Sequence, residues 1–449
     1  MRKNDIIPLS ITALTHEGSG VGRFDGKAVF VPLTAPGDEI DAKIVGVRSG
    51  YAFGRAEALR IASPHRVDNT CPAFARCGGC ALRHLSYPAE LAAKEEWVRE
   101  NLARIGKIHP QWDAIIPSPR TERYRNKAAY PVRMVDGRVR VGFFAPRSHT
   151  LIPVDDCLLQ PEFFAAACRE ICRFCEEHGI PTYDEARHSG ILRHIYIRHG
   201  EATGQTLVCL VINGKALPQA TELYERLLPL CPGEVSLHIN RNRERTNVIL
   251  GAGTRHVAGP KCITDVLCGM TVRLSAQSFY QVNREAAQLL YAAALEYAAP
   301  NPGDLLLDLY CGAGTIGLSM AGQVGQIIGV ESVAQAVRDA DENARANGIA
   351  NVRFICADAA GAAQELHRQG ARPNIAVVDP PRKGLDGGTI EHLAAMRPGK
   401  IVYVSCNSAT LARDLEALGV AGYETLKCRA ADLFARTAHV ECIALLAPR

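Results

Sequence analysis

The pattern of hydrophobic and polar residues changes character twice along this chain. Before residue 60 it predicts short strands that end at turns rich in glycine, proline and aspartate; the strand-like runs are 11–14, 27–31, 41–45 and 53–59. Short, evenly spaced strands suit a small barrel that closes its own edges. We therefore expect an OB-like β-barrel over residues 1–63, with a boundary near Ala62-Ser63-Pro64.

The pattern over residues 64–275 is mixed. An amphipathic helix is expected from Pro88 to Gly106, with charged residues between its apolar positions. Alternating residues then predict strands, with helical pieces near 161–178 and 216–229; the clearest strands are 138–143, 192–198 and 236–240. This mixture indicates a central α+β domain.

From about residue 283 helices alternate with buried strands. A helix at 284–299 comes first; strands are then expected at 304–310, 326–330, 351–355, 374–378 and 400–405, and helices at 315–323, 333–347, 388–395 and 409–418. Such alternation predicts βαβ units and a doubly wound, Rossmann-like parallel sheet over residues 276–449. The last strand-like run, 440–446, predicts a closing antiparallel hairpin at the sheet edge.

The net charge of +4 conceals a local basic excess. Residues 64–150 carry 15 Lys and Arg against 8 Asp and Glu, a net of +7 (15 − 8). This excess suggests a surface that faces a polyanion. The basic run Arg120, Arg123, Arg125 and Lys127 has Tyr124 inside it, a combination that suits phosphate contacts and stacking on unpaired bases.

Neither a membrane span nor a signal peptide is expected. No apolar run approaches the ~20 residues that cross a bilayer, and the start of the chain lacks the apolar core of a signal peptide. We therefore expect a cytoplasmic protein. In that compartment its 16 cysteines are metal ligands, a nucleophile or core residues rather than disulfides.

Three closely spaced cysteines form the first candidate site. Cys71, Cys77 and Cys80 follow the spacing C-x5-C-x2-C, and Cys157 offers a fourth thiol. Four thiolates can bind a structural zinc, usually in paired CxxC knuckles, or an iron–sulfur cluster, which takes three clustered cysteines and one distant one. The single CxxC favours iron–sulfur, while a role without metal stays open.

The second candidate is Cys406, at the end of the strand-like run 401–404. Asn407 or Ser408 is a plausible N-cap for the helix that follows. Ligands bind at the carboxyl ends of strands in open α/β sheets, and a helix N-terminus favours the thiolate form. Free cysteines are also among the most buried residues. This stretch alone does not decide between a nucleophile and an inert core thiol.

A glycine-rich turn follows the first strand of the predicted sheet. Gly312, Gly314 and Gly317 satisfy GxGxxG between a strand and a helix, and Glu331 ends the next strand. A carboxylate there binds the ribose of either NAD or S-adenosylmethionine. Asp379-Pro380-Pro381 resembles the fourth-strand motif of adenosylmethionine-dependent methyltransferases rather than any motif of dehydrogenases.

Several motifs in one order resemble a known family. They are Cys71 to Cys80, Gln277 to Asn283, Asp308 to Gly314, Asp379 to Arg382, Ser405 to Asn407 and Ala438 to Glu441. Their order is similar to that of the RNA uracil-5-methyltransferases, which make 5-methyluridine in ribosomal or transfer RNA. In addition, Gly18 to Arg23, Val29 to Pro32 and Pro36 to Asp38 resemble a TRAM domain.

This resemblance implies a role for each candidate residue. Cys406 would add to uracil carbon 6, and Glu441 would remove the carbon 5 proton after methyl transfer. Glu331 would take the ribose of S-adenosylmethionine; the other implied contacts with that cofactor are Gln281, Tyr310, Gly312, Gly314, Thr315, Asp358 and Asp379. A 4Fe–4S cluster would be held by Cys71, Cys77, Cys80 and Cys157. One departure lies before Thr437, where the family commonly has Pro-His and this chain has Ala435-Arg436.

The expected function is therefore methylation of carbon 5 of a uridine in RNA by a monomeric enzyme. We expect 23S ribosomal RNA as the substrate, with transfer RNA as the alternative. Two hypotheses from other classes remain beside it. An NAD-dependent oxidoreductase would use GxGxxG and Glu331, and a non-catalytic RNA-binding protein would use the barrel and the basic run.

Overall fold

The N-terminal β-barrel is closed. The computed structural model describes all 449 residues, and its first five strands pair in the order β1-β2-β3-β5-β4. They are β1 (Ile6–Leu14), β2 (Gly20–Phe24), β3 (Lys27–Val31), β4 (Glu39–Val47) and β5 (Tyr51–Ile61). Alternate residues of each strand fill the barrel, including Ile11, Val29 and Ile44. The prediction of a small barrel is confirmed; β2 was missed because its glycines resemble a turn.

The central part is a mixed seven-stranded sheet. Its order is β13-β12-β11-β10-β7-β8-β9, with α2 (Glu162–Glu177) and α3 (Ala220–Leu227) packed on it. The strands are β7 (Lys127–Val135), β8 (Arg138–Phe144), β9 (Leu151–Pro153), β10 (Leu192–His199), β11 (Thr206–Ile212), β12 (Val235–Arg241) and β13 (Gly253–Ala258). All seven residues of β11 are buried, as an apolar run in mid-sheet predicts.

The C-terminal part is an eight-stranded sheet of order β18-β17-β16-β19-β20-β22-β21-β6. Its strands are β6 (Gln111–Trp112), β16 (Leu305–Leu309), β17 (Gln326–Glu331), β18 (Val352–Cys356), β19 (Ile375–Val378), β20 (Lys400–Ser405), β21 (Tyr423–Ala431) and β22 (Glu441–Pro448). Strands β16 to β20 run parallel, and β22 runs antiparallel to both β20 and β21. The predicted doubly wound sheet with a closing antiparallel hairpin is thus confirmed.

Helices cover both faces of this sheet. One face carries α4 (Arg284–Ala298), α5 (Thr315–Ser319) and the short helix Ala321–Gln323, with the hairpin β14 (Ile263–Leu267) and β15 (Met270–Leu274) and with α6 (Ala334–Ala346) beside them. The other face carries α1 (Tyr87–Arg104), α7 (Ala359–Arg368), α8 (Gly387–Met396) and α9 (Ser408–Val420). Two separate hydrophobic cores therefore lie on the two faces of one sheet. Packing on both faces fixes the positions of the strand ends.

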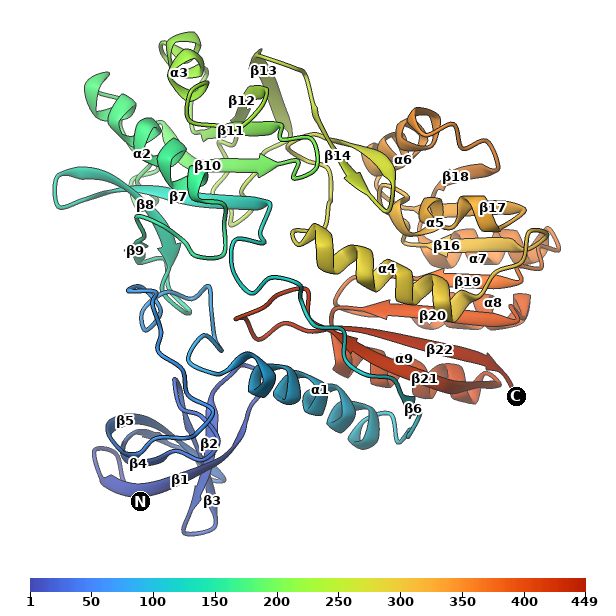
Figure 1. Cartoon of the computed structure of the whole chain (residues 1–449), viewed down its shortest axis with the longest axis horizontal. Helices are drawn as coiled ribbons and strands as arrows, with labels where there is room; N and C mark the ends of the chain where they lie inside the picture. The colour runs from blue at the N-terminus through green and yellow to red at the C-terminus, as the bar shows by residue number, and fades with distance from the viewer.

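The first helix does not lie with its neighbours in sequence. Figure 1 shows α1 running along the C-terminal sheet, next to α9, while β6 pairs with β21 at the sheet edge. Residues 87–112 thus belong in space to the C-terminal lobe. The division into 1–63, 64–275 and 276–449 stays a prediction, to which we add that this segment functions with the last part of the chain.

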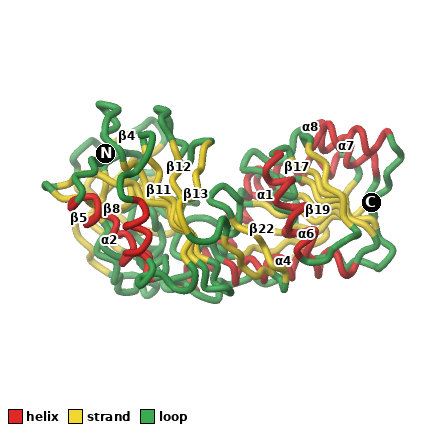
Figure 2. The backbone as a smooth tube through the Cα atoms, turned by 90° about the horizontal axis from the view of Figure 1, so that it is seen from above, coloured by secondary structure: helices red, strands yellow, loops and turns green.

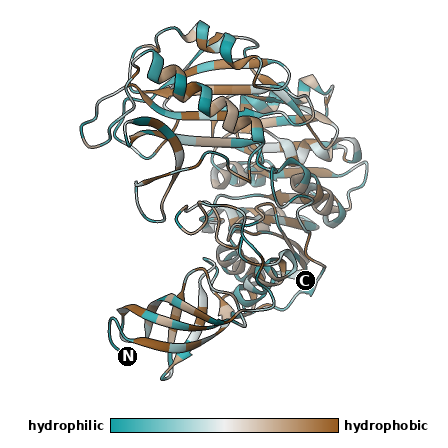
Figure 3. Cartoon of the chain, turned by 60° about the vertical axis from the view of Figure 1, so that its left-hand side comes forward, coloured by the Kyte–Doolittle hydropathy of each residue, from teal (hydrophilic) through white to brown (hydrophobic).

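The molecule has an extended outline. Figure 2 shows the central and C-terminal sheets as two neighbouring lobes, and in Figure 3 the barrel projects away from both. In Figure 1 the chain from α1 to β7 and the chain from β21 to β22 approach each other between barrel, central sheet and C-terminal sheet. None of the helices is long and apolar enough to cross a bilayer.

Candidate active site

Cys406 lies between β20 and α9, beside the first residue of β22. Ser405, the last residue of β20, pairs with Cys442 in the antiparallel ladder, so that the following residue, Cys406, comes level with Glu441. The side chain of Asn407 accepts hydrogen bonds from the backbone of Ala409 at 3.1 Å and Thr410 at 3.4 Å. This N-cap, one of the two expected, starts α9 and fixes the turn that presents the thiol.

A cleft of about 1160 Å³ opens at these strand ends. It is lined by eight of the ten residues predicted for catalysis and cofactor binding: Gln281, Tyr310, Gly312, Glu331, Asp358, Asp379, Cys406 and Glu441. The structure does not bring Gly314 and Thr315 into this lining. The Thr315 hydroxyl instead lies 3.0 Å from the hydroxyl of Tyr291, behind the glycine-rich turn.

The glycine-rich turn is held by Glu331. One carboxylate oxygen of Glu331 accepts a hydrogen bond from the backbone of Gly312 at 3.1 Å, and the other accepts from Val333 at 2.8 Å. Gly312 has a φ of 55° and Tyr310 a φ of 64°, both in the left-handed region. The turn therefore exposes backbone at the cleft, where a ligand can approach closely.

The buried carboxyl group of Glu441 and the partly buried one of Asp379 lie near the thiol of Cys406. Burial, helped by the charge of Asp379, raises the pKa of Glu441 to about 8, and burial raises the pKa of Asp379 to about 7. Arg382 opposes the shift of Glu441 by its positive charge. The Glu441 carboxyl thus changes protonation close to neutral pH, which is the property required of a general base.

The thiol of Cys406 has a raised pKa, contrary to the effect expected from its place at a helix N-terminus. Burial contributes most, Glu441 and Asp379 add to it, and Arg382 acts in the opposite direction. Loss of water and two nearby carboxylates therefore outweigh the nearby positive groups. Protonation of these carboxyl groups, or their neutralisation by a bound ligand, would lower the pKa of the Cys406 thiol and favour the thiolate.

Cys71, Cys77, Cys80 and Cys157 converge on a separate cavity of about 140 Å³. No group of three or more His, Cys, Asp or Glu side chains in the structure is arranged to hold a metal ion. Burial raises the pKa of Cys157 to about 12, so this thiol stays protonated unless positive charge stabilises its thiolate. The four thiols line one cavity, with Phe74, Phe143 and Leu159 in its wall, and the binding of an iron–sulfur cluster by these thiols stays a prediction.

The basic run has a different role from the one expected. The side chain of Tyr124 is fully buried and donates a hydrogen bond to the carbonyl of Ala435 at 2.9 Å, so the prediction that it stacks on bases is wrong. Arg120 pairs with Glu201 and Glu285, and Arg123 pairs with Asp156. Arg125 and Lys127 do line the cleft.

Sequence reasoning gave no role to two polar residues near Cys406. Arg382 and His439 both line the cleft, and a guanidinium nitrogen of Arg382 lies 3.4 Å from Nδ1 of His439. Each stands within three residues of a residue that was assigned, Asp379 or Glu441. Arg382 follows β19 and His439 precedes β22. These positions at the ligand-binding edge of the sheet could have identified both residues.

Two family descriptions match the chain, and close relatives span it fully. Residues 264–449 match the family described as tRNA (Uracil-5-)-methyltransferase, and residues 2–56 match the TRAM domain. An uncharacterized RNA methyltransferase of Halalkalibacterium halodurans is 43% identical over 99% of this chain and 98% of its own length. One from Streptococcus agalactiae is 39% identical over 99% of each chain.

One solved structure resembles the whole molecule. The Pyrococcus abyssi tRNA (uracil-54, C5)-methyltransferase, in complex with S-adenosyl-L-homocysteine, superposes with a TM-score of 0.78. It is 27% identical, and the superposition covers 98% of this chain and 99% of that one. The similarity therefore includes the arrangement of all three parts.

Proposed function

Because this chain belongs to the family of S-adenosylmethionine-dependent RNA (uracil-5-)-methyltransferases, we propose that it methylates a uridine through a covalent bond between Cys406 and the base. The observation that supports this best is the adjacency of Cys406 and Glu441 in one cleft. A nucleophile and a base that act on neighbouring carbons of one ring must lie side by side. The two residues come from different strands that only the fold brings together.

Carbon 5 of uracil is too weak a nucleophile to attack a methyl sulfonium unaided. When the Cys406 thiolate adds to carbon 6, the ring becomes an enolate that is nucleophilic at carbon 5. Asp379, Glu331 and Gln281 lie in the same cleft, where they can hold the methyl donor against that carbon. The target base must leave its stack to reach the thiol, so the substrate is an unpaired or remodelled segment.

Glu441 completes the reaction. After methyl transfer its carboxylate takes the proton from carbon 5, the electrons of that bond form the carbon 5–carbon 6 double bond, and the bond from carbon 6 to sulfur breaks. The thiolate of Cys406 is thereby restored and the proton resides on Glu441. A carboxyl group with a pKa of about 8 holds such a proton readily at neutral pH.

The test is the substitution Cys406→Ala, with Cys262→Ala as the control, since Cys262 lies outside the cleft. We expect Cys406→Ala to abolish 5-methyluridine formation, and the wild type to form a covalent complex with RNA that contains 5-fluorouridine. The control should match the wild type in both assays. Full activity of Cys406→Ala would contradict the proposal.

We further propose that Cys71, Cys77, Cys80 and Cys157 hold a 4Fe–4S cluster. Bound there, the cluster would supply positively charged iron that holds the four thiolates together. Protein purified without oxygen should be brown and contain about four irons per chain, and Cys157→Ser should lose the colour. Zinc in place of iron would refute the cluster.

For the substrate we propose 23S ribosomal RNA. The tRNA (uracil-54, C5)-methyltransferase of Pyrococcus abyssi supports transfer RNA as the second candidate. Mass-spectrometric mapping of 5-methyluridine in both RNAs from a strain that lacks this protein decides between them. The modified uridine that disappears is the substrate.

A further inference from the structure

The loop between β21 and β22 leads directly to the proposed base. It spans residues 432–440, carries Phe434 and His439 of the cleft wall, and ends at Glu441. Its last turn is closed by Thr437, which donates to the carbonyl of Phe434 at 2.7 Å and accepts from the backbone of His439 at 3.2 Å. The position of Glu441 at the first residue of β22 thus depends on how this loop is held.

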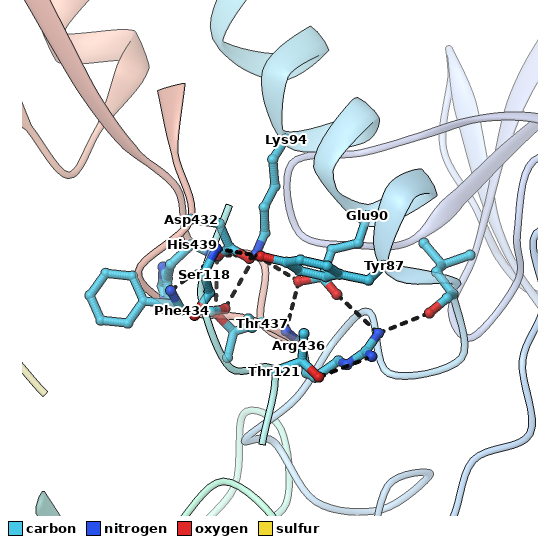
Figure 4. Close-up of polar contacts among 12 residues, drawn as sticks. Tyr87, Glu90, Lys94, Ser118, Thr121, Asp432, Phe434, Arg436, Thr437 and His439 are labelled. Atoms are coloured by element: carbon cyan, nitrogen blue, oxygen red, sulfur yellow. Dashed lines mark hydrogen bonds and ion pairs between the residues drawn. The ribbon is translucent and has the colours of Figure 1, made fainter. Parts of the chain in front are cut away.

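A buried lysine of α1 holds the start of the loop (Figure 4). The Lys94 ammonium lies 2.7 Å from a carboxylate oxygen of Asp432 and 2.8 Å from one of Glu90, and it donates to the carbonyl of Phe434 at 3.2 Å. All three charged side chains are fully buried. A lysine so enclosed is stable only while both carboxylates surround it.

Arg436 brings the second positive charge. Its φ of 70° is left-handed, and this turn aims its backbone N–H at Glu90, 2.6 Å away. Its guanidinium lies 3.4 Å from the other oxygen of Glu90 and donates to the carbonyl of Leu85 at 3.0 Å. Two cations and two carboxylates thus form one balanced network, which we call the α1 clamp (Glu90, Lys94, Asp432 and Arg436).

Further hydrogen bonds to the loop come from outside the C-terminal sequence. Tyr87 donates from its hydroxyl to Asp432 at 2.9 Å. The backbone N–H groups of Ala81 and Leu82, next to Cys80, donate to the carbonyl of Arg436 at 3.0 and 3.1 Å. The loop that carries the base is therefore fastened by α1 and by the cysteine segment.

We propose that Lys94 is a positioning residue for the base: through the α1 clamp it keeps the 432–440 loop where Glu441 reaches carbon 5. This inference rests on the proposed function. Lys94 does not line the cleft and touches no reacting atom. Its removal leaves Asp432 buried without a cation and Glu90 with Arg436 alone, so the loop must move to bring water or protons to these carboxylates.

A displaced loop should affect two steps of the reaction differently. Glu441 takes no proton from the uracil base during addition of Cys406 or methyl transfer, whereas it does so in release of the product. With 5-fluorouridine RNA no proton stands on carbon 5, so the reaction stops at the adduct whatever the state of the base. A displaced loop slows release from normal RNA and spares the fluorinated adduct.

The experiment compares Lys94→Met with Lys107→Met, a matched substitution just beyond α1 whose ammonium is exposed and 3.8 Å from Glu416. For Lys94→Met we expect an adduct with 5-fluorouridine RNA at a rate within about threefold of the wild type. With normal RNA we expect product release to fall at least tenfold, with a denaturation-resistant protein–RNA complex accumulating. Lys107→Met should match the wild type.

Tyr87→Phe serves as the milder second variant, since it leaves every charge in place and removes only the hydroxyl that donates to Asp432 and accepts from the backbone of Ser118. Like Lys94→Met, it should slow product release, by severalfold. If Lys94→Met does not fold, Tyr87→Phe alone tests the positioning role. Release at the wild-type rate in the folded variants, or equal loss of adduct formation and release, overturns the positioning role. Absence of any adduct in the wild type refutes the proposed function instead.

Discussion

At the scale of single residues, the site is governed by carboxyl groups in places that lack water. Glu441 and Asp379 face the same thiol, and burial raises the pKa values of both. Their mutual repulsion and the raised pKa of Cys406 make the charges of this trio interdependent. A positively charged methyl donor bound in the cleft would relieve that repulsion, so we expect its binding to favour the thiolate of Cys406.

The pKa of Glu441 gives the pH dependence of product release. A base acts only when ionised, so release should rise with pH up to about 8, the value to which burial raises this pKa, and level off above it. Single-turnover release measured between pH 6 and 9 checks this. Glu441→Gln should flatten the profile and trap the methylated adduct, with a loss of at least about 100-fold in turnover. An unchanged profile in Glu441→Gln would exclude Glu441 as the base.

The sequence predicted which residues meet at the ends of strands. It did not predict which side chains of a loop point into the cleft. Cys406, Asp379 and Glu331 follow buried strands of one parallel sheet, so their meeting at one edge follows from the pattern. The spacing of a glycine-rich turn does not fix which side chains point outward, and Thr315 points away from the cleft. Tyr124 shows the same limit, since basic neighbours in sequence do not tell whether an aromatic ring is exposed.

At the scale of elements, the packing of α1 against α9 supports the turn that carries Cys406. The side-chain amide of Asn101 donates to the Ser408 hydroxyl at 2.7 Å, two residues after Cys406. Gly106 lies so close to α9 that a Cβ atom there would stand 2.7 Å from the carbonyl of Ala412. The helix from the first half of the chain is therefore part of the wall behind the site.

Leu102→Ala tests this packing. Leu102 is fully buried in the core that α1 shares with α9, so its truncation should lower the free energy of unfolding by about 2–5 kcal/mol. Val420→Ala on α9 is the control, because Val420 is 88% exposed. Urea titration followed by circular dichroism measures both. A cost near zero for Leu102→Ala would mean that α1 is not docked in solution.

Most helices and strands were predictable because their hydrophobic residues recur with the period of a helix or of a strand. The strands of the C-terminal sheet and helices α4, α6 and α9 follow their hydrophobic patterns closely. Helix α7 was missed although Ala362, Ala363 and Leu366 form one buried face, and β6, a two-residue strand, has no period at all. Its pairing with β21 is set by the docking of α1, which is a property of the tertiary structure.

At the scale of the whole molecule, Asp38 joins the barrel to the chain that follows. Its buried carboxylate accepts hydrogen bonds from the backbone of Ala35 at 2.6 Å and Ser63 at 2.9 Å, and it pairs with Arg66 at 2.7 Å. Burial alone would raise the pKa of Asp38, but the bonds from Arg66 and the two backbone groups hold it below its ordinary value of 3.8. These contacts therefore hold the barrel in a fixed position relative to the chain that follows it.

Asp38→Asn should weaken the contacts at this junction. Since the folded pKa is lowered, the carboxylate stabilises the fold at pH values above 3.8, and this contribution is lost as the pH falls through the folded pKa. At pH 7 we expect a loss of about 1.5–3 kcal/mol, the value of hydrogen bonds to a charged group. Thermal unfolding of both proteins, followed down to pH 3, should show the difference shrinking in acid. A difference that is constant with pH would contradict this account.

The α1 clamp also determines when the enzyme becomes complete. Lys94 and Asp432 are separated by 338 positions, so on the ribosome the lysine emerges long before its partner exists. The barrel has all its strands by residue 61 and can fold early, as N-terminal domains do. Lys94 stays hydrated until the last strands appear, and its burial is among the final steps of assembly. If the clamp holds the base as we propose, a nascent or truncated chain that lacks residues 432–441 cannot form it.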